Sequence, residues 1–169
     1  MTETQDKPMN AAGASEMQAL TFELSGEVFA LEAGIVQEIL DLLPETRVPG
    51  APGFVDAVIN FRGQVIPLAD LRVAFGMDQA ETSIDSRIIV VELDLEGEPA
   101  LVGLRTDRVC EVATLGLGAS EPAPSVGMRW PSEYVRRLVK REGDFVVLPD
   151  LQAIFAPQKD APAASQLRH

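Results

Sequence analysis

The sequence contains one cysteine and one histidine, and the histidine is the last residue of the chain. A single cysteine cannot form an internal disulfide, and the usual cysteine and histidine ligand sets of a zinc site need more residues than these. Cys110 lies in the alternating stretch "DRVCEVATL", which predicts a buried thiol on a strand. A nucleophilic cysteine needs a nearby base, so the sequence predicts that Cys110 is not catalytic. It also predicts no bound metal and no cofactor.

Long apolar runs are also missing, so no segment is predicted to span a bilayer. The first residues are polar and acidic and lack the features of a secretory signal, which predicts a cytoplasmic protein. A net charge of −12 disfavours nucleic acid and anionic lipid surfaces as partners. One basic stretch stands against this acidic background and suggests either a solvated face or a docking patch for an acidic protein. It contains Arg129, Arg136, Arg137, Lys140 and Arg141.

Aromatic residues make up only 5% of the chain, whereas Val, Ile, Leu and Ala are abundant, which favours β-structure with an aliphatic core. An internal repeat gives this structure an organisation. Residues 54–75, "FVDAVINFRGQVIPLADLRVAF", align without a gap at an offset of 80 with residues 134–155, "YVRRLVKREGDFVVLPDLQAIF". Each unit is too small to stand alone, so we expect the two to pack about a pseudo-twofold axis.

Each half reads as five short strands separated by turns, and we expect each to form a small closed barrel because closure removes exposed edges. The predicted fold is all-β, with two pseudo-symmetric five-stranded barrels and short helical turns. The predicted strands are 20–25, 28–32, 36–42, 57–62 and 64–68, then 87–94, 99–105, 108–114, 134–140 and 144–148. The predicted boundaries are a disordered tail at 1–19, a first barrel at 20–75, a linker at 76–86, a second barrel at 87–155 and a disordered tail at 156–169.

Asp70 and Asp150 follow the last strand of each half and are expected to cap the helical turns. A pair of aspartates in a duplicated β protein also invites comparison with aspartic proteases. Here, however, leucines follow both aspartates, where such sites have a small hydroxyl residue and a glycine. Replacing both aspartates by asparagine would abolish turnover by such an enzyme, whereas a non-catalytic protein would only lose stability.

The two halves differ most at the hairpin of the repeat, where Arg62 matches Glu142, Asn60 matches Lys140 and Phe61 matches Arg141. This hairpin carries "NFRGQVIPLADLR", which resembles the motif of the CheW-like coupling proteins of bacterial chemotaxis. The stretches "GIVQEIL" and "RVPGAPGFVDAVIN" are also similar to that family, and the resemblance runs from about residue 20 to 155. It implies two intertwined SH3-like barrels and a non-catalytic scaffold.

The resemblance further implies an adaptor that couples the cytoplasmic signalling tips of chemoreceptors, the methyl-accepting chemotaxis proteins, to the regulatory domain of the histidine kinase CheA. The protein would then be recruited to receptor arrays at the inner membrane and take part in rings. The receptor would bind in a groove between the barrels, and the kinase at one end of the first barrel. The receptor-binding residues implied are Val36, Glu38, Arg62, Gly63 and Val109. The kinase-binding residues implied are Leu40, Pro52, Gly53 and Phe54.

For Arg62, the alternative to recognition is a surface arginine that forms a weak ion pair. For Pro52 and Phe54, it is a turn and its core anchor. An adaptor of a surface-sensing, pilus or second-messenger pathway also fits the same fold. A regulatory module cut from a larger relative fits less well, because neither predicted tail has room for a phosphorylation domain.

Overall fold

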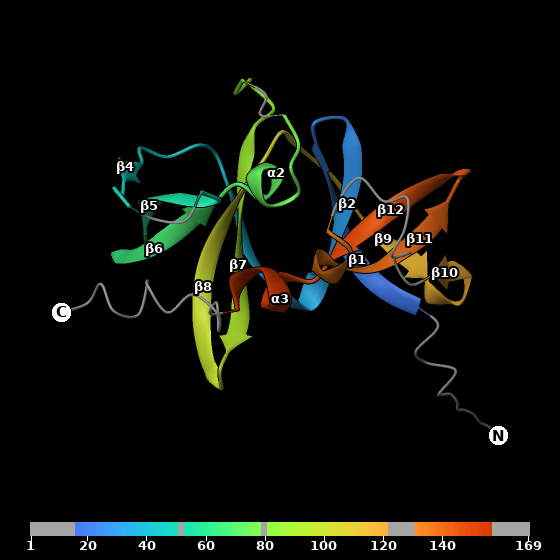
Figure 1. The fold of residues 1–169 in the computed structure, drawn as a ribbon. Helices are drawn as coiled ribbons and strands as arrows, with labels where there is room; N and C mark the ends of the chain where they lie inside the picture. Colours follow the sequence, from blue (N-terminus) through green and yellow to red (C-terminus); the bar gives the residue numbers. More distant parts are fainter. Residues whose placement is uncertain (1–15, 51–52, 79–80, 122–130, 157–169) are drawn as a thin grey trace.

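The computed structural model describes residues 16–50, 53–78, 81–121 and 131–156, and Figure 1 shows two sheets side by side with α2 and α3 near their boundary. The strands are β1 (Glu16–Leu24), β2 (Glu27–Glu32), β3 (Val36–Leu40), β4 (Thr46–Arg47), β5 (Val55–Phe61), β6 (Gln64–Ala69), β7 (Arg87–Leu95), β8 (Glu98–Thr106), β9 (Arg108–Gly116), β10 (Ser120–Glu121), β11 (Val135–Arg141) and β12 (Asp144–Pro149). The helical turns are η2 (Ala33–Ile35), α2 (Leu71–Ala74), η3 (Leu117–Ala119), η4 (Ser132–Tyr134) and α3 (Leu151–Phe155).

The first sheet has the strand order β3-β7-β8-β6-β5-β4, and the second has the order β10-β11-β12-β2-β1-β9. Each sheet therefore contains strands from both halves of the sequence. The hairpin β1–β2 lies in the second sheet beside β12, and the hairpin β7–β8 lies in the first sheet beside β6. The barrels are intertwined, as the resemblance implied, and the prediction of contiguous barrels at 20–75 and 87–155 is wrong.

The exchange follows from two parallel strand pairs that cover otherwise open edges. Leu68 of β6 lies opposite Gly103 of β8, and Val147 of β12 lies opposite Phe29 of β2. An uncovered edge would expose a row of unpaired backbone groups, and here the hairpin of the other half pairs with it. The two sheets thus become pseudo-symmetric copies of one another.

All ten predicted strands are present, which confirms the all-β fold class with short helical turns. Each sheet also contains a sixth strand of two residues, β4 or β10, which was missed because two residues show no alternation. The boundary of the N-terminal tail is wrong, since β1 begins at Glu16 and Ala19 is fully buried. The remainder of the predicted tails, residues 1–15 and 157–169, lies outside the described residues.

Buried residues form one cluster inside each sheet and a larger central cluster with members from both sheets. Two ring contacts in the central region join one half of the sequence to the other. The rings of Phe54 and Phe155 lie 5.5 Å apart, and those of Phe75 and Tyr134 lie 6.2 Å apart. Phe54 matches Tyr134 and Phe75 matches Phe155 in the repeat, so these two contacts are equivalent under the pseudo-symmetry.

The helical turns are capped as predicted. The Asp70 carboxylate accepts a hydrogen bond of 3.0 Å from the Arg72 N–H, and the Asp150 carboxylate accepts one of 3.0 Å from the Ala153 N–H. These contacts satisfy backbone donors that the first turn leaves without a partner. Both aspartates have a structural role at equivalent places in the two halves.

Candidate functional site

Arg62 and Gly63 form the tip of the hairpin between β5 and β6. Both have positive φ angles, of 55° and 80°, as a two-residue type I′ turn requires. The Gly63 N–H donates a hydrogen bond of 2.9 Å to the side-chain oxygen of Asn60, which fixes the turn. The hairpin therefore projects the arginine away from the barrel, and its side chain is 73% exposed.

The Arg62 guanidinium donates a hydrogen bond to the Glu38 carboxylate and lies over the Phe61 ring, 5.0 Å from its centroid. Glu38 belongs to β3, which is one edge of the first sheet, whereas β5 lies next to the opposite edge. The ion pair therefore joins strands that are far apart in the sheet order, and it closes the curled sheet towards a barrel. Two of the predicted receptor-binding residues are in direct contact.

The second barrel has the same type of contact in a shifted register. Glu111 occupies in β9 the place that Glu38 occupies in β3, and it accepts a hydrogen bond of 2.7 Å from Arg141. In the repeat, Arg141 matches Phe61, one position before the residue that matches Arg62. The charge difference between the two hairpins therefore does not remove the arginine–glutamate contact, which the second barrel makes from the neighbouring position.

Val36 is the first residue of the edge strand β3, and Val109 is the second residue of the edge strand β9. Both are half-buried, and both pack against the central cluster. Val36 lies opposite Val91 in the first sheet, and Val109 lies opposite Phe22 in the second. Val36, Glu38, Arg62 and Gly63 thus belong to one sheet, and Val109 contributes the equivalent position of the other.

The predicted kinase-binding residues are divided between different environments. Leu40 packs against the cluster inside the first barrel, whereas Phe54 packs against the central cluster and the Phe155 ring. Gly53 is exposed, and a β-carbon at this position would lie 3.5 Å from Val73. Pro52 lies outside the described residues. The structure supports the core-anchor interpretation of Phe54 and does not place it in the same cluster as Leu40.

A cleft of about 420 Å³ lies between the two sheets beside α3. Its apolar lining includes Leu31 and Leu93, and charged residues at its margin include Glu32, Glu92 and Arg136. The residues of the predicted receptor and kinase sites do not line it. Sequence reasoning missed the cleft because its lining comes from strands of both sheets, which only the hairpin exchange places together.

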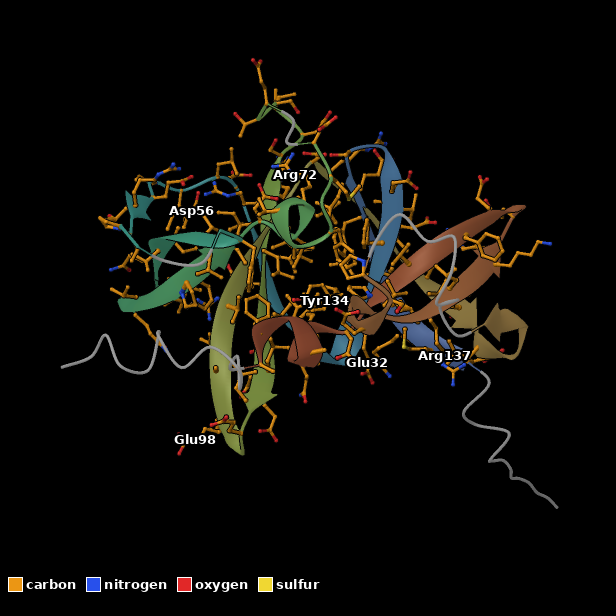
Figure 2. The ribbon with its side chains drawn as sticks, in the orientation of Figure 1. Glu32, Asp56, Arg72, Glu98, Tyr134 and Arg137 are labelled. Carbon is orange, nitrogen blue, oxygen red and sulfur yellow. The ribbon has the colours of Figure 1, made fainter. Side chains whose placement is uncertain are left out.

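A buried ionic network also went unrecognised. The Arg72 guanidinium bonds to Asp70 at 2.9 Å and to Asp107 at 2.8 Å, and Asp107 also accepts the Ser25 N–H at 2.6 Å. Burial by itself lowers the pKa of Arg72, but the hydrogen bond and charge of Asp70 together with Asp107 raise it above its ordinary value. Figure 2 labels Arg72, which belongs to α2. The network ties α2 to the turn where the chain passes from the first sheet to the second.

The basic stretch does not form a single patch. Arg136 lines the cleft, Arg141 binds Glu111, and Lys140 lies opposite Phe145 in the hairpin. Successive side chains of a strand point to opposite faces, which divides a run of charges between them. Arg129 lies outside the described residues.

The prediction that Cys110 is buried is wrong, because the thiol is exposed on the edge strand β9. Partial desolvation and the nearby carboxylate of Glu23 raise the pKa of Cys110, so the thiol is a poor nucleophile at neutral pH.

Within the part of the chain that the structure describes, no helix is long and apolar enough to cross a bilayer. In the same residues, no group of three or more His, Cys, Asp or Glu side chains could hold a metal ion.

The fold is a domain of two intertwined SH3-like β-barrels, with a surface ion pair across each barrel and an aspartate cap on each of the helical turns α2 and α3. The family model for the CheW-like domain matches residues 18–159, and the chain therefore belongs to this family, whose members are non-catalytic scaffolds of chemotaxis signalling. The chemotaxis protein CheW of Rhizobium meliloti is 29% identical over 87% of this chain and 92% of its own length. The CheW of Klebsiella aerogenes is 30% identical over 84% of this chain and 83% of its own.

A solved structure shows the same fold. The crystal structure of the scaffolding protein TtCheW from Thermoanaerobacter tengcongensis matches with a TM-score of 0.74 and 30% sequence identity. The match covers 84% of this chain and 94% of that one. Protein PilI of Pseudomonas aeruginosa is 29% identical over a shorter stretch, 60% of this chain and 55% of its own length.

Proposed function

We propose that the protein is an adaptor that couples the cytoplasmic tips of chemoreceptors to the regulatory domain of a CheA-type histidine kinase. The observation that carries this proposal is that the two barrels present equivalent surfaces. Each edge strand has a half-buried valine, a glutamate that holds an arginine, and then an exposed apolar residue, Ile39 in β3 and Val112 in β9. Together with the match of residues 18–159 to the CheW-like family model, these surfaces support a scaffold that binds other proteins.

The receptor site takes its residues from both edge strands and the first hairpin. Val36 and Val109 supply partly accessible apolar surface, and Arg62, which is largely exposed although it binds Glu38, retains N–H groups for carbonyls or carboxylates of the receptor. Gly63 is required because its positive φ shapes the turn that projects Arg62. Glu38 orients the arginine and holds it near β3.

The kinase site lies at the end of the first barrel, with Leu40, Gly53 and Phe54 as the described members of the set and Pro52 as the fourth. Exposed apolar residues near these positions support an interface here, because Val48 and Val73 leave part of their side chains in solvent. The kinase regulatory domain is the partner that this end would bind.

The test is co-sedimentation of the protein with receptor signalling fragments and the cognate kinase, comparing the wild type with Arg62→Glu. Capture of the wild type in the assembly and loss of the folded variant are the expected results. Arg141→Glu is the matched control, since it breaks the equivalent ion pair of the second barrel without touching the first hairpin. Equal capture of the wild type and Arg62→Glu would remove Arg62 from the receptor site, and no capture of the wild type would contradict the adaptor function.

A second pathway is favoured by the similarity to protein PilI of Pseudomonas aeruginosa, namely an adaptor of a non-flagellar chemosensory system. A deletion strain separates the two: a flagellar adaptor is required for spreading in soft agar, whereas an adaptor of a surface-sensing or pilus system is required for surface motility. A fluorescent fusion that forms clusters only when receptors are present would support recruitment to arrays at the inner membrane. Sedimentation velocity of the purified protein tests self-association into rings.

A further inference from the structure

Residues 41–45 cross one end of the first barrel. They connect β3 to β4, and these two strands are the opposite edges of the first sheet. We refer to residues 41–45 as the strap. Leu43 packs against the cluster inside the barrel, whereas Leu42 leaves 41% of its surface in solvent. The strap therefore closes the barrel on its inner side and presents an apolar residue on its outer side.

Arg105 of β8 holds the end of the strap. Its guanidinium binds both carboxylate oxygens of Glu45, Nη1 to Oε2 and Nη2 to Oε1, each at 2.6 Å, and a third bond of 3.2 Å reaches Asp56. The arginine side chain is only 16% exposed. Paired bonds between guanidinium and carboxylate fix direction as well as distance, and lysine cannot reproduce them. These contacts also raise the pKa of Arg105 and lower that of Glu45, chiefly through the hydrogen bonds between the two side chains.

The other end of the strap has a weaker anchor. Arg87 of β7 lies 3.5 Å from Asp41, and the Asp41 side chain is 89% exposed. An ion pair this open to solvent contributes little to stability. Both anchoring arginines belong to the hairpin β7–β8, which the second half of the sequence inserts into the first barrel. Of the two ionic anchors of the strap, Arg105 is therefore the stronger, and it acts together with the packing of Leu43 and the pairing of β4 with β5.

Among the described residues, the second barrel has no such anchor. In the first sheet, Leu68 lies opposite Gly103. In the second sheet, Val147 lies opposite Phe29, so the next residue, Leu148, which matches Leu68 in the repeat, is level with Ala30. Gly103 therefore matches Ala30, and two residues further on Arg105 matches Glu32. Glu32 lines the cleft and makes no ion pair with another described residue. In that barrel the connection between β9 and β10 is the helical turn η3. Within the part of the chain that the structure describes, the ionic clamp is therefore found in the first barrel and not at the equivalent position of the second.

We propose that Arg105 is a positioning residue for kinase docking: it fixes the strap so that Leu42 contacts the kinase regulatory domain beside Leu40. The inference rests on the proposed function, which places the kinase at this end of the first barrel. Without Arg105, Glu45 loses both of its hydrogen bonds to β8, and Arg47 remains as the cation beside Asp56, so the hold of β8 on the strap is lost. The arginine thus acts on a partner that it does not touch.

The experiment measures the affinity of the purified protein for two probes by calorimetry, the cognate kinase regulatory domain and a receptor signalling fragment. We expect Arg105→Gln and Glu45→Gln each to weaken binding of the kinase domain about tenfold and to leave binding of the receptor fragment unchanged. The matched control is Glu32→Gln, the equivalent position in the second barrel, which should change neither affinity. Glu45→Gln decides the question if Arg105→Gln does not fold.

A double-mutant cycle separates positioning from general destabilisation. If Arg105 acts through the strap, Leu42→Ala weakens kinase binding in the wild type and has little further effect in Arg105→Gln. Hydrogen exchange should show faster exchange in residues 41–45 of Arg105→Gln, with β5 and β6 unchanged. The inference would be overturned, and the adaptor function left intact, if the wild type binds the kinase domain and Arg105→Gln binds it with the same affinity. Additive effects of Arg105→Gln and Leu42→Ala on this affinity would have the same meaning. Failure of the wild type to bind the kinase domain would reject the proposed function itself, and the inference with it.

Discussion

The Arg141 guanidinium donates a hydrogen bond of 2.7 Å to Glu111, and this contact repeats in the second barrel the pair that Arg62 and Glu38 form in the first. The repeat aligns Arg141 with Phe61, so the two halves make the same contact from different positions of the hairpin. Closure of each curled sheet therefore uses one arginine and one glutamate, and either of two adjacent hairpin positions can supply the arginine.

The closing ion pairs are expected to add little to global stability. Both arginines are partly or largely exposed, and exposed ion pairs contribute up to about 1 kcal/mol. A double-mutant cycle with Arg141→Gln and Glu111→Gln should give a coupling energy below about 1 kcal/mol in urea unfolding, and so should Arg62→Gln with Glu38→Gln. A coupling energy above about 2 kcal/mol for either pair would contradict this minor contribution to stability.

Removal of the buried Arg72 should have a much larger effect. Arg72→Met leaves the carboxylates of Asp70 and Asp107 without the cation that compensates their burial. Breaking a buried pair in this way costs about 3 kcal/mol or more. Urea unfolding of the variant measures this loss, and Gln152→Met at the equivalent, exposed position of the other half is the control. Equal midpoints for Arg72→Met and the wild type would contradict a stabilising role for the network.

The clamp of the strap should depend on pH in a defined direction. The hydrogen bond from Arg105 lowers the pKa of Glu45 below its ordinary value of 4.5 in the folded protein. The stabilisation is therefore fully present above pH 4.5, and it is lost as the pH falls through the lower folded-state value. The difference in unfolding free energy between the wild type and Glu45→Gln should stay constant from neutral pH to about pH 5 and shrink below pH 4.5. A difference that grows on acidification would have the wrong sign for this pair.

Gly103 is required where β8 passes β6. A β-carbon at this position would lie 3.2 Å from Ile88 Cγ2 and 3.3 Å from Leu68 Cδ1, inside the cluster of the first barrel. Overpacking of this kind costs about 1 to 3 kcal/mol, so Gly103→Ala should lower the unfolding free energy by that amount. Gly34→Ala is the matched control, because no atom lies within 4 Å of the position its β-carbon would take. An unchanged midpoint for Gly103→Ala would show that Ile88 and Leu68 move aside at no cost.

Much of the local structure was predictable from the chain. Alternating apolar residues located the strands, and Asp70 and Asp150 were identified as caps, because both signals act within a few residues. The contact of Arg62 with Glu38 was not predictable, although both residues were candidates. Their strands are separated in the sheet order, and the curl of the sheet is what brings them together.

The hairpin exchange shows where local information ends. A repeat matches itself equally well whether each half pairs with its own hairpin or with the hairpin of the other half, so residues 20–75 gave no reason to separate β1 and β2 from β3 to β6. The prediction that Cys110 is buried was wrong for a related reason. Alternation identifies a strand, but it does not show that the strand is an edge strand with an open face.

The sequence by itself determined the strands, the turns, the caps and the family, because these depend on the order of neighbouring residues. Only the tertiary structure decided which hairpin completes which barrel, where the cleft lies, and that Arg105 binds Glu45, sixty positions earlier in the chain. The physical reason is that these contacts form between segments that approach one another only after two curled sheets have packed around a shared core.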